Sequence, residues 1–496
     1  MVHLDGESLT LAQLEAIARH GAAVAIADAA IARVRASRAV VDAHVQRGTP
    51  TYGVNTGFGA LADVAIPGDQ LAALQVNLLR SHAAGVGDPL PVPVVRALMA
   101  LRANVLAKGY SGVRVETLQA LVGLLNAGAH PRIPARGSVG ASGDLAPLAH
   151  LALVLIGEGE LLEGPRPANA PSPVALEAKE GLALINGTQA STAVLALCVI
   201  DAARLARVAD IAAAMSVDAL RGSFHPFEAR LHRVRPVPGQ VDSADNLWHL
   251  GQDSAINRSH ENCGRIQDAY CMRCAPQVHG AAREAIAFAR RIVEVEANAA
   301  TDNPMVFADA GDLVSGGNFH GAPIALAADT LAIGITQLAT ISERRTDRLL
   351  TAGESGLPAF LVRESGLHSG LMMAQVTAAA LASEMKILAH PAAVDTIPTS
   401  AGREDHVSMS MTAALKAAQA VDLAQQVIAI ELLAACQALD LLAPLTTSPP
   451  LAAVQRAVRA IVPPLDVDRP PAPDITRIAS LVRDGAIERA CGSQVR

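Results

Sequence analysis

A set of long apolar segments in the second half of the chain most limits the folds it can adopt. The segment 191–220 carries charges at Asp201, Arg204, Arg207 and Asp210, each three residues after the last. On a helix, this spacing makes a thin polar stripe on an otherwise apolar surface. Long helices that are apolar on most faces predict a bundle, and one that can be shared between subunits. Similar segments cover residues 277–299, 322–349, 370–389 and 407–443.

The composition also favours helices. Hydrophobic residues make up 51% of the chain but aromatic residues only 2%, so the core must consist of Ala, Leu, Val and Ile. Ala and Leu are strong helix formers. We therefore expect a mainly α-helical protein, with a loop-rich helical N-terminal domain over 1–190 and a long-helix bundle domain with C-terminal helices over 191–496.

Shorter helices separated by loops are predicted in the N-terminal domain. Thr10 and Gln13 predict a capping box at the start of the first helix, and Gly21 predicts its end. Further helical patterns cover residues 22–47, 69–84, 92–128 and 145–156.

The charge balance and the hydropathy limit the partners. The formal net charge is −7, so no basic surplus exists to hold a nucleic-acid backbone, and we expect a small-molecule ligand. Mean hydropathy is +0.30, but charges such as Asp329 and Glu431 interrupt the apolar stretches, which leaves no clean span of about 20 residues. The first residues lack the pattern of a signal peptide. We expect a cytoplasmic protein without membrane contact.

The loop Ala141-Ser142-Gly143 allows two interpretations. In one, small residues form a turn, and Ser142 or Asp144 caps the following helix. In the other, the amide nitrogen of Gly143 attacks the carbonyl of Ala141. Loss of one water from the ring and one from Ser142 then leaves an exocyclic alkene. Gly143 has no Cβ and suits such a compressed turn, and Asp144 could assist proton transfer.

The segment from Ala141 to His150 resembles the signature of the aromatic amino-acid ammonia-lyase family, whose members carry a methylideneimidazolone prosthetic group. Matching segments run from about residue 50 to about residue 410. The resemblance implies a fumarase/aspartase-like long-helix bundle and a homotetramer whose sites are lined by more than one subunit. It also implies a methylideneimidazolone formed autocatalytically from Ala141, Ser142 and Gly143, supported by Asp144, with no metal or dissolved cofactor.

Three more residues receive roles from this resemblance. Tyr52, in a glycine-rich loop, would be the base that removes a proton from Cβ of the substrate. Asn186 would bind the substrate or an oxygen of the prosthetic group, and Phe319 would pack beside that group. Local sequence alone also allows a tyrosine packed in a turn, a helix-capping Asn and an ordinary core Phe.

Gln267, Tyr270 and Arg273 resemble the family's segment for the substrate carboxylate. They are spaced three apart, so one helical face can present all three. Arg273 can grip a carboxylate with two hydrogen bonds. The alternative is a surface arginine in an ion pair.

Two positions indicate the substrate within the family. Ser81-His82 resembles the histidine-selective form, and an imidazole on His82 can exchange a hydrogen bond with a substrate imidazole. Glu404 stands where the histidine-selective members carry Glu, and it can engage the substrate or shuttle a proton. Arg403 departs from the family, since many members have a neutral residue there. The resemblance thus implies conversion of L-histidine to trans-urocanate and ammonia, the first step of histidine degradation.

Several alternatives stay open. The nearest are a phenylalanine or tyrosine ammonia-lyase and an aminomutase of the same family. A catalytically inactive helical scaffold would keep the loop linear. A metal hydrolase using some of the 15 histidines would need metal-ligand spacing that the sequence does not show.

Overall fold

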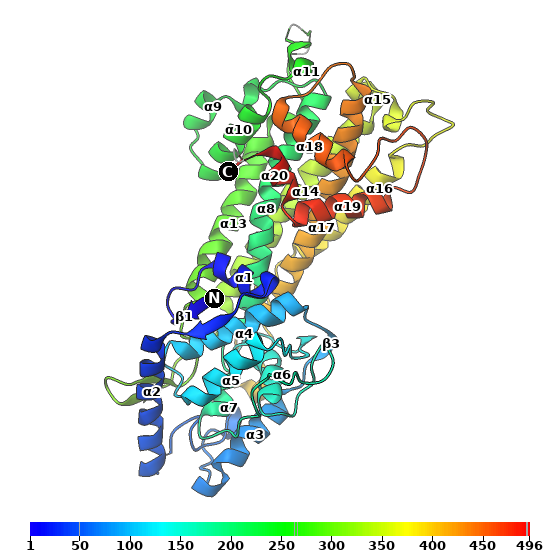
Figure 1. Cartoon of the computed structure of the whole chain (residues 1–496). Coiled ribbons are helices and arrows are strands. Elements are labelled where there is room, and N and C mark those ends of the chain that lie inside the picture. The colour runs from blue at the N-terminus through cyan, green and yellow to red at the C-terminus, as the bar shows by residue number, and fades with distance from the viewer. Residues whose placement is uncertain (49, 262, 265, 493–494) are drawn as a thin grey trace. The chain divides into compact units, whose positions relative to one another are not determined.

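The computed structural model describes residues 1–48, 50–261, 263–264, 266–492 and 495–496 (Figure 1). Over these residues it is mainly helical, with three two-stranded sheets. This confirms the predicted fold class. The chain divides into two compact units: the first comprises 1–197, 290–329 and 391–415, and the second comprises 198–289, 330–390 and 416–496.

This division differs from the two continuous domains expected from the sequence, because two later segments join the first unit. Backbone hydrogen bonds show how they do so. The amide of Gly321 donates to the carbonyl of Gly140 at 3.0 Å, and the amide of Met409 donates to Val139 at 2.7 Å. Both bonds end in the loop before Ser142, so segments far apart in sequence build one unit around that loop.

The first helix has the predicted ends. Thr10 caps α1 (Leu11–His20) in a capping box with Gln13, and Gly21 closes the helix in the left-handed region at φ 66. The other regular elements within the first unit are β1 (Val2–Leu4), β2 (Val24–Ile26), α2 (Asp28–Arg47), η1 (Gly59–Leu61), η2 (Gly68–Gln70), α3 (Leu71–His82), β3 (Val86–Pro89), α4 (Val92–Ala107), α5 (Val115–Asn126), β4 (Pro134–Arg136), α6 (Leu145–Leu155), α7 (Glu180–Ile185), β5 (Met305–Phe307), β6 (Asp312–Val314) and η5 (Ser400–Gly402).

Two predicted helices of this unit were wrong in extent. The stretch 92–128 is two helices, α4 and α5, because Gly109 at φ 88 and Gly112 at φ 70 turn the chain between them. The stretch 22–47 begins with β2, which pairs in parallel with β1, and only then continues as α2. Pairing with a strand distant in sequence carries no local signal.

Four long helices contribute one end to the first unit and the rest of their length to the second. They are α8 (Gln189–Ala219), α13 (Ala275–Glu296), α14 (Ala322–Leu350) and α17 (Ser410–Leu441). Each agrees with a predicted apolar segment to within three residues at both ends. The hydrophobic periodicity of the sequence was therefore sufficient to locate them.

Within the second unit, α8 and α17 each contain a stretch that is buried on all sides. Every residue of 208–219 in α8 and of 427–439 in α17 is buried, and a hydrogen bond joins the two helices where Ser216 donates to Glu431 at 2.7 Å. The remaining elements are η3 (His225–Phe227), α9 (Ala229–Arg233), α10 (Pro238–Leu250), α11 (Ala255–Arg258), α12 (Tyr270–Arg273), α15 (Ala352–Ser355), η4 (Ala359–Leu361), α16 (Met372–Leu388), α18 (Pro449–Arg459), α19 (Ala472–Arg483) and α20 (Ala486–Cys491).

Two of the long helices, α14 and α17, are long and apolar enough to cross a membrane by length and composition. Their most apolar windows are 67% and 78% buried inside the molecule. Such burial is the property of helices in a packed core.

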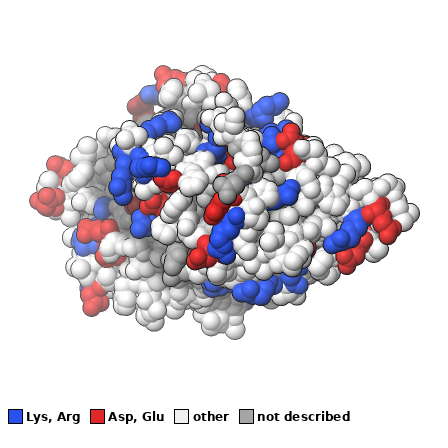
Figure 2. All heavy atoms as spheres, turned by 90° about the horizontal axis from the view of Figure 1, so that it is seen from above, with Lys and Arg blue, Asp and Glu red and all other residues white. Residues whose placement is uncertain are grey.

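Charges of both signs share the surface. On the face shown in Figure 2, Lys and Arg side chains lie next to Asp and Glu side chains rather than in one separate field. The pair Arg483–Asp422, at 3.0 Å, is an exposed example in the second unit. Exposed ion pairs contribute about 0–1 kcal/mol each, so the fold depends mainly on the apolar core.

Candidate active site

Two backbone segments meet at the tripeptide Ala141-Ser142-Gly143. Gly143 has φ 74 and forms an isolated bridge with Gly187. The amide of Asp144 donates to the carbonyl of Gly187 at 2.7 Å. A Cβ on Gly143 would lie 2.3 Å from that carbonyl oxygen, so only glycine fits here. Because Gly143 has no side chain, its amide nitrogen is also free to approach the carbonyl carbon of Ala141, as the cyclisation requires.

Asp144 lies fully buried behind the tripeptide. One carboxylate oxygen accepts from the amide and the hydroxyl of Ser191, at 2.7 and 2.8 Å, and the other accepts from the hydroxyl of Ser138 at 2.8 Å. Burial raises the pKa of Asp144 above its ordinary value, and these hydrogen bonds oppose the rise. Asp144 thereby joins the loop to the start of α8, as a supporting residue should.

Ser142 faces a carboxylate 262 positions away. Its hydroxyl donates to Oε1 of Glu404 at 2.5 Å, and the other carboxylate oxygen accepts from the hydroxyl of Thr399. The backbones of Thr399 and Glu404 are also paired, since each amide donates to the other's carbonyl, at 3.0 and 3.3 Å. The turn between them holds Glu404 in place.

Asn186 approaches the tripeptide from the end of α7. Its Nδ2 donates to the carbonyl of Ser142 at 2.8 Å, while its Oδ1 is buried and has no hydrogen-bond partner among the described residues. The fully buried Arg102 holds this corner by donating to the carbonyl of Asn186 at 2.9 Å and to Gln189 at 2.6 Å. Burial lowers the pKa of Arg102 to about 10. The sequence analysis missed Arg102, although an arginine inside the apolar helix α4 is a signal for a buried structural role.

A cavity of about 320 Å³ in the first unit opens above the tripeptide. It brings together six of the residues that the sequence singled out. They are Tyr52, His82, Ser142, Asn186, Phe319 and Glu404. Ala141 and Gly143 flank Ser142 in the chain, and Asp144 follows them, so the structure gathers the predicted prosthetic-group segment and these six residues at one place.

Tyr52 enters the cavity from a loop. Its ring meets the ring of Phe58 edge to face, with 6.4 Å between centroids, and the amide of Gly59 donates to its hydroxyl at 3.5 Å. The tyrosine is half-buried and lines the cavity.

His82 lies at the end of α3, where the backbone selects its tautomer. Its Nδ1 is 2.9 Å from the carbonyl of Leu78. A carbonyl can only accept, so Nδ1 carries the hydrogen, and in the neutral ring Nε2 is left as an acceptor. His82 can therefore accept a hydrogen bond from an N–H group in the cavity.

Two histidines connect the loops that carry Phe319 and Glu404. Nε2 of His320 donates to the backbone carbonyl of His406 at 3.1 Å, and the two rings are stacked with 5.8 Å between centroids. The sequence analysis assigned no role to either residue. Their contact fixes the position of one cavity wall relative to the other.

Arg403, the departure from the family pattern, has an acidic neighbour other than Glu404. Its guanidinium lies 3.9 Å from the carboxylate of Asp63, and both side chains are mostly exposed. A pair of this kind contributes about 0–1 kcal/mol.

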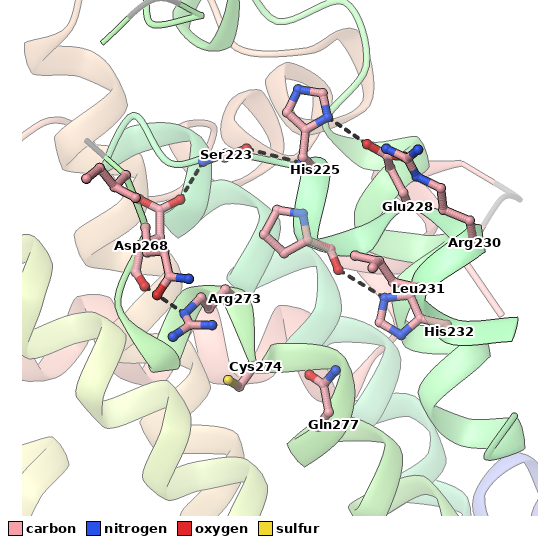
Figure 3. Close-up of a pocket in the computed structure, with 13 residues that line it drawn as sticks. Ser223, His225, Glu228, Arg230, Leu231, His232, Asp268, Arg273, Cys274 and Gln277 are labelled. Atoms are coloured by element: carbon pink, nitrogen blue, oxygen red, sulfur yellow. Dashed lines mark hydrogen bonds and ion pairs between the residues drawn. The ribbon is translucent and has the colours of Figure 1, made fainter. Parts of the chain in front are cut away.

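Gln267, Tyr270 and Arg273 lie in the second unit, and none of them lines the 320 Å³ cavity. The guanidinium of Arg273 lies 4.5 Å above the ring of Tyr270 and donates through Nε to the carbonyl of Asp268 at 3.0 Å. Gln267 and Arg273 line a separate open cavity of about 830 Å³, in which Figure 3 shows Arg273 and Asp268 on one side and His225 on the other. Gln267 and Arg273 thus line a cavity of the second unit, and Ser142 lines one of the first unit.

Comparison with known proteins places this geometry in a family. The family model described as aromatic amino acid lyase matches residues 9–460. A histidine ammonia-lyase of Myxococcus xanthus is 55% identical over 498 residues, which cover 99% of this chain and 98% of the relative.

Solved structures agree over the whole chain. The crystal structure of histidine ammonia-lyase from Trypanosoma cruzi has a TM-score of 0.92 and 47% identity, and the match covers 100% of this chain and 96% of that one. Tyrosine aminomutase from Streptomyces globisporus has a TM-score of 0.94 and 38% identity, with both chains covered completely. The match of the family model over most of the chain, together with these full-length relatives, shows that the chain belongs to the aromatic amino acid lyase family.

Proposed function

We propose that this chain is a carbon–nitrogen lyase that converts L-histidine to trans-urocanate and ammonia. Its full-length relatives at 50–55% identity are named for this activity. The proposal includes a cytoplasmic location and a prosthetic group that the chain makes from its own backbone.

A single observation carries the choice of substrate. His82 and Glu404 line the same cavity as Ser142. His82 presents an acceptor and Glu404 a carboxylate, so together they can accept one hydrogen bond from each N–H of a protonated imidazole ring. A cavity selective for a phenyl or phenol ring would need neither group at these positions.

The residues present fit a methylideneimidazolone formed from Ala141, Ser142 and Gly143. Gly143 is the residue that the close approach of Gly187 demands. Asn186 already donates to the carbonyl of Ser142, and its buried Oδ1 has no partner in the described part of the chain. When formed, the group supplies an electrophile for the amine or the ring of the substrate.

The remaining roles belong to side chains. His82 and Glu404 orient the imidazole, Tyr52 removes the proton from Cβ, and Phe319 packs beside the tripeptide. Asn186 holds the carbonyl of Ser142. Tyr52 as the base and His82 as the acceptor contribute to the rate because they are held in position. Proton transfer to or from a well-placed group accelerates a reaction about 10²- to 10⁴-fold.

The substrate carboxylate needs a cation, and we assign Arg273 to it, with Gln267 and Tyr270, from another copy of the chain. The exposure of their segment supports this assignment, since Ile266 is at 96% and Tyr270 at 71% of full exposure. A homotetramer would cover such an apolar surface and complete each site.

The test is turnover by the purified chain. L-histidine should yield urocanate, followed by its ultraviolet absorbance, and ammonia in equal amount, while L-phenylalanine and L-tyrosine should react far more slowly. Ser142→Ala is the control: it should fold but lose activity by several orders of magnitude, because it has no hydroxyl to eliminate.

The full-length similarity to a tyrosine aminomutase makes an aminomutase the second candidate. Amino-acid analysis of the same reaction separates the two. If β-histidine forms in place of urocanate, the chain is an aminomutase and not a lyase. If histidine does not react at all, the substrate assignment is wrong.

A further inference from the structure

The hydrogen bond between Ser142 and Glu404 uses the hydroxyl that the formation of the prosthetic group would remove. The bond joins the hydroxyl of Ser142 to Oε1 of Glu404 at 2.5 Å. Formation of the alkene removes this same hydroxyl, so the contact cannot exist afterwards. Glu404 is therefore placed against a leaving group in a reaction that precedes any turnover of substrate.

The rest of the site directs Glu404 to this hydroxyl. Its Oε2 is occupied by the hydroxyl of Thr399, which leaves Oε1 for Ser142. On the other side, Asn186 holds the carbonyl of Ser142 at 2.8 Å. Serine and glutamate are thus both held in position, as proton transfer requires.

The other carboxyl of the segment is engaged elsewhere. Both oxygens of Asp144 accept hydrogen bonds, one from Ser138 and the other from Ser191, and the side chain is fully buried. Among the described residues, Glu404 is the one whose carboxyl group is hydrogen-bonded to the Ser142 hydroxyl.

We infer that Glu404 is the general acid that expels the hydroxyl of Ser142 during maturation, before it serves the substrate; the inference rests on the proposed prosthetic group. In the elimination, the Cα proton of Ser142 passes to a solvent water, the Cα–Cβ double bond forms and the Cβ–Oγ bond breaks. When Glu404 carries a proton on Oε1, the direction of this hydrogen bond reverses and Oγ becomes the acceptor. The oxygen then keeps its own proton, takes the one from Oε1 and leaves as water. Glu404 regains its proton from solvent, so atoms and protons balance.

The experiment is a time course of intact mass on full-length chain made by cell-free synthesis. The native chain should fall below its encoded mass by two waters. Glu404→Gln keeps the size of the side chain and one acceptor oxygen but cannot donate a proton to a leaving group. It should lose the second water about 100-fold more slowly or worse, so that a species short of only one water accumulates.

Matched variants separate chemistry from structure. Arg403→Gln changes the exposed neighbour in the same turn and should mature at the native rate, and Ser142→Ala marks the mass of a chain that cannot lose the second water. With Glu404→Ala, added formate should enter the cavity and restore the loss of the second water. A role limited to packing would not respond to a small acid.

The outcomes are distinct. If the native chain keeps its full encoded mass, the prosthetic group itself is wrong. If the native chain loses two waters and Glu404→Gln and Glu404→Ala lose them at the same rate, the prosthetic group stands and the role of Glu404 in maturation is wrong. A slow Glu404→Ala that formate does not accelerate also contradicts the general-acid role.

Discussion

At the scale of single residues, backbone carbonyls decide what several polar side chains can do. The carbonyl of Leu78 sets the tautomer of His82, and the paired backbones of Thr399 and Glu404 aim a carboxylate at Ser142. A neutral imidazole with a fixed acceptor is selective, because a site that hydrogen-bonds its substrate rejects analogues that leave the bond unmade.

Replacing His82 should therefore change selectivity more than stability. In His82→Leu, kcat/KM for L-histidine should fall about 10- to 100-fold, the effect of losing one hydrogen bond worth about 1–3 kcal/mol. Activity on L-phenylalanine should rise relative to histidine. Steady-state kinetics with both substrates measures the change. The control is His20→Leu, at an exposed histidine, and an unchanged preference in His82→Leu would contradict the assignment.

Asp218 makes stability depend on pH. It is buried in the second unit and accepts from the hydroxyls of Ser254, at 2.8 and 2.9 Å, and Thr447, at 2.5 Å. Burial raises its pKa from 3.8 to about 6, against the effect of these hydrogen bonds. Because the folded-state pKa is above the unfolded one, the stabilisation is complete below pH 3.8 and is lost as the pH rises through about 6.

Asp218→Asn should remove that pH dependence. The difference in unfolding free energy between the variant and the native chain should be more favourable to the variant at pH 8 than at pH 4. The change should be on the order of 3 kcal/mol, since one pKa unit corresponds to about 1.4 kcal/mol. Denaturant unfolding at the two pH values measures this. Equal differences at both pH values would show that ionised Asp218 costs the fold nothing.

At the scale of elements, a buried ion pair joins two long helices of the second unit. Arg345 in α14 binds Glu431 in α17 through two hydrogen bonds, at 2.5 and 2.9 Å, and both side chains are fully buried. Arg345 also donates to the carbonyl of Cys271 in α12, at 3.3 Å. The pair thus connects the helix packing to the turn that carries Tyr270 and Arg273.

Breaking this pair on one side should be costly. Arg345→Met should lose about 3–5 kcal/mol of unfolding free energy, because Glu431 stays buried without its partner. The double variant Arg345→Met/Glu431→Leu should recover most of the loss, since it buries no unpaired charge. Urea unfolding of the two variants measures both values. A double variant as unstable as the single one would contradict this explanation.

At the scale of the whole molecule, the proposed sharing of sites between copies can be tested by mixing defects. Ser142→Ala and Arg273→Ala should each be nearly inactive as homo-oligomers. In mixed oligomers, some sites combine an intact Ser142 from one copy with an intact Arg273 from another, and those sites should be active. Coexpression of the two variants, purification through two tags and an assay for urocanate give the measurement. If the mixed oligomers are no more active than the separate variants, Ser142 and Arg273 of the same chain form one site, and the proposed sharing is wrong.

Much of the fold was predictable because it depends on signals that lie close together in sequence. Thr10, Gln13 and Gly21 define a helix through contacts within a few residues, and the long helices follow from the spacing of apolar residues. The break between α4 and α5 at Gly109 and Gly112 is also a local signal, which the prediction passed over.

The sequence by itself determined the family, the long helices and the tripeptide, because a contiguous motif and a hydrophobic period are properties of neighbouring residues. The tertiary structure alone decided that Glu404 reaches Ser142 and that Arg102 secures Asn186. It also decided that segments 290–329 and 391–415 complete the first unit. These arrangements depend on which surfaces pack together over the whole chain, and no short stretch of sequence records that choice.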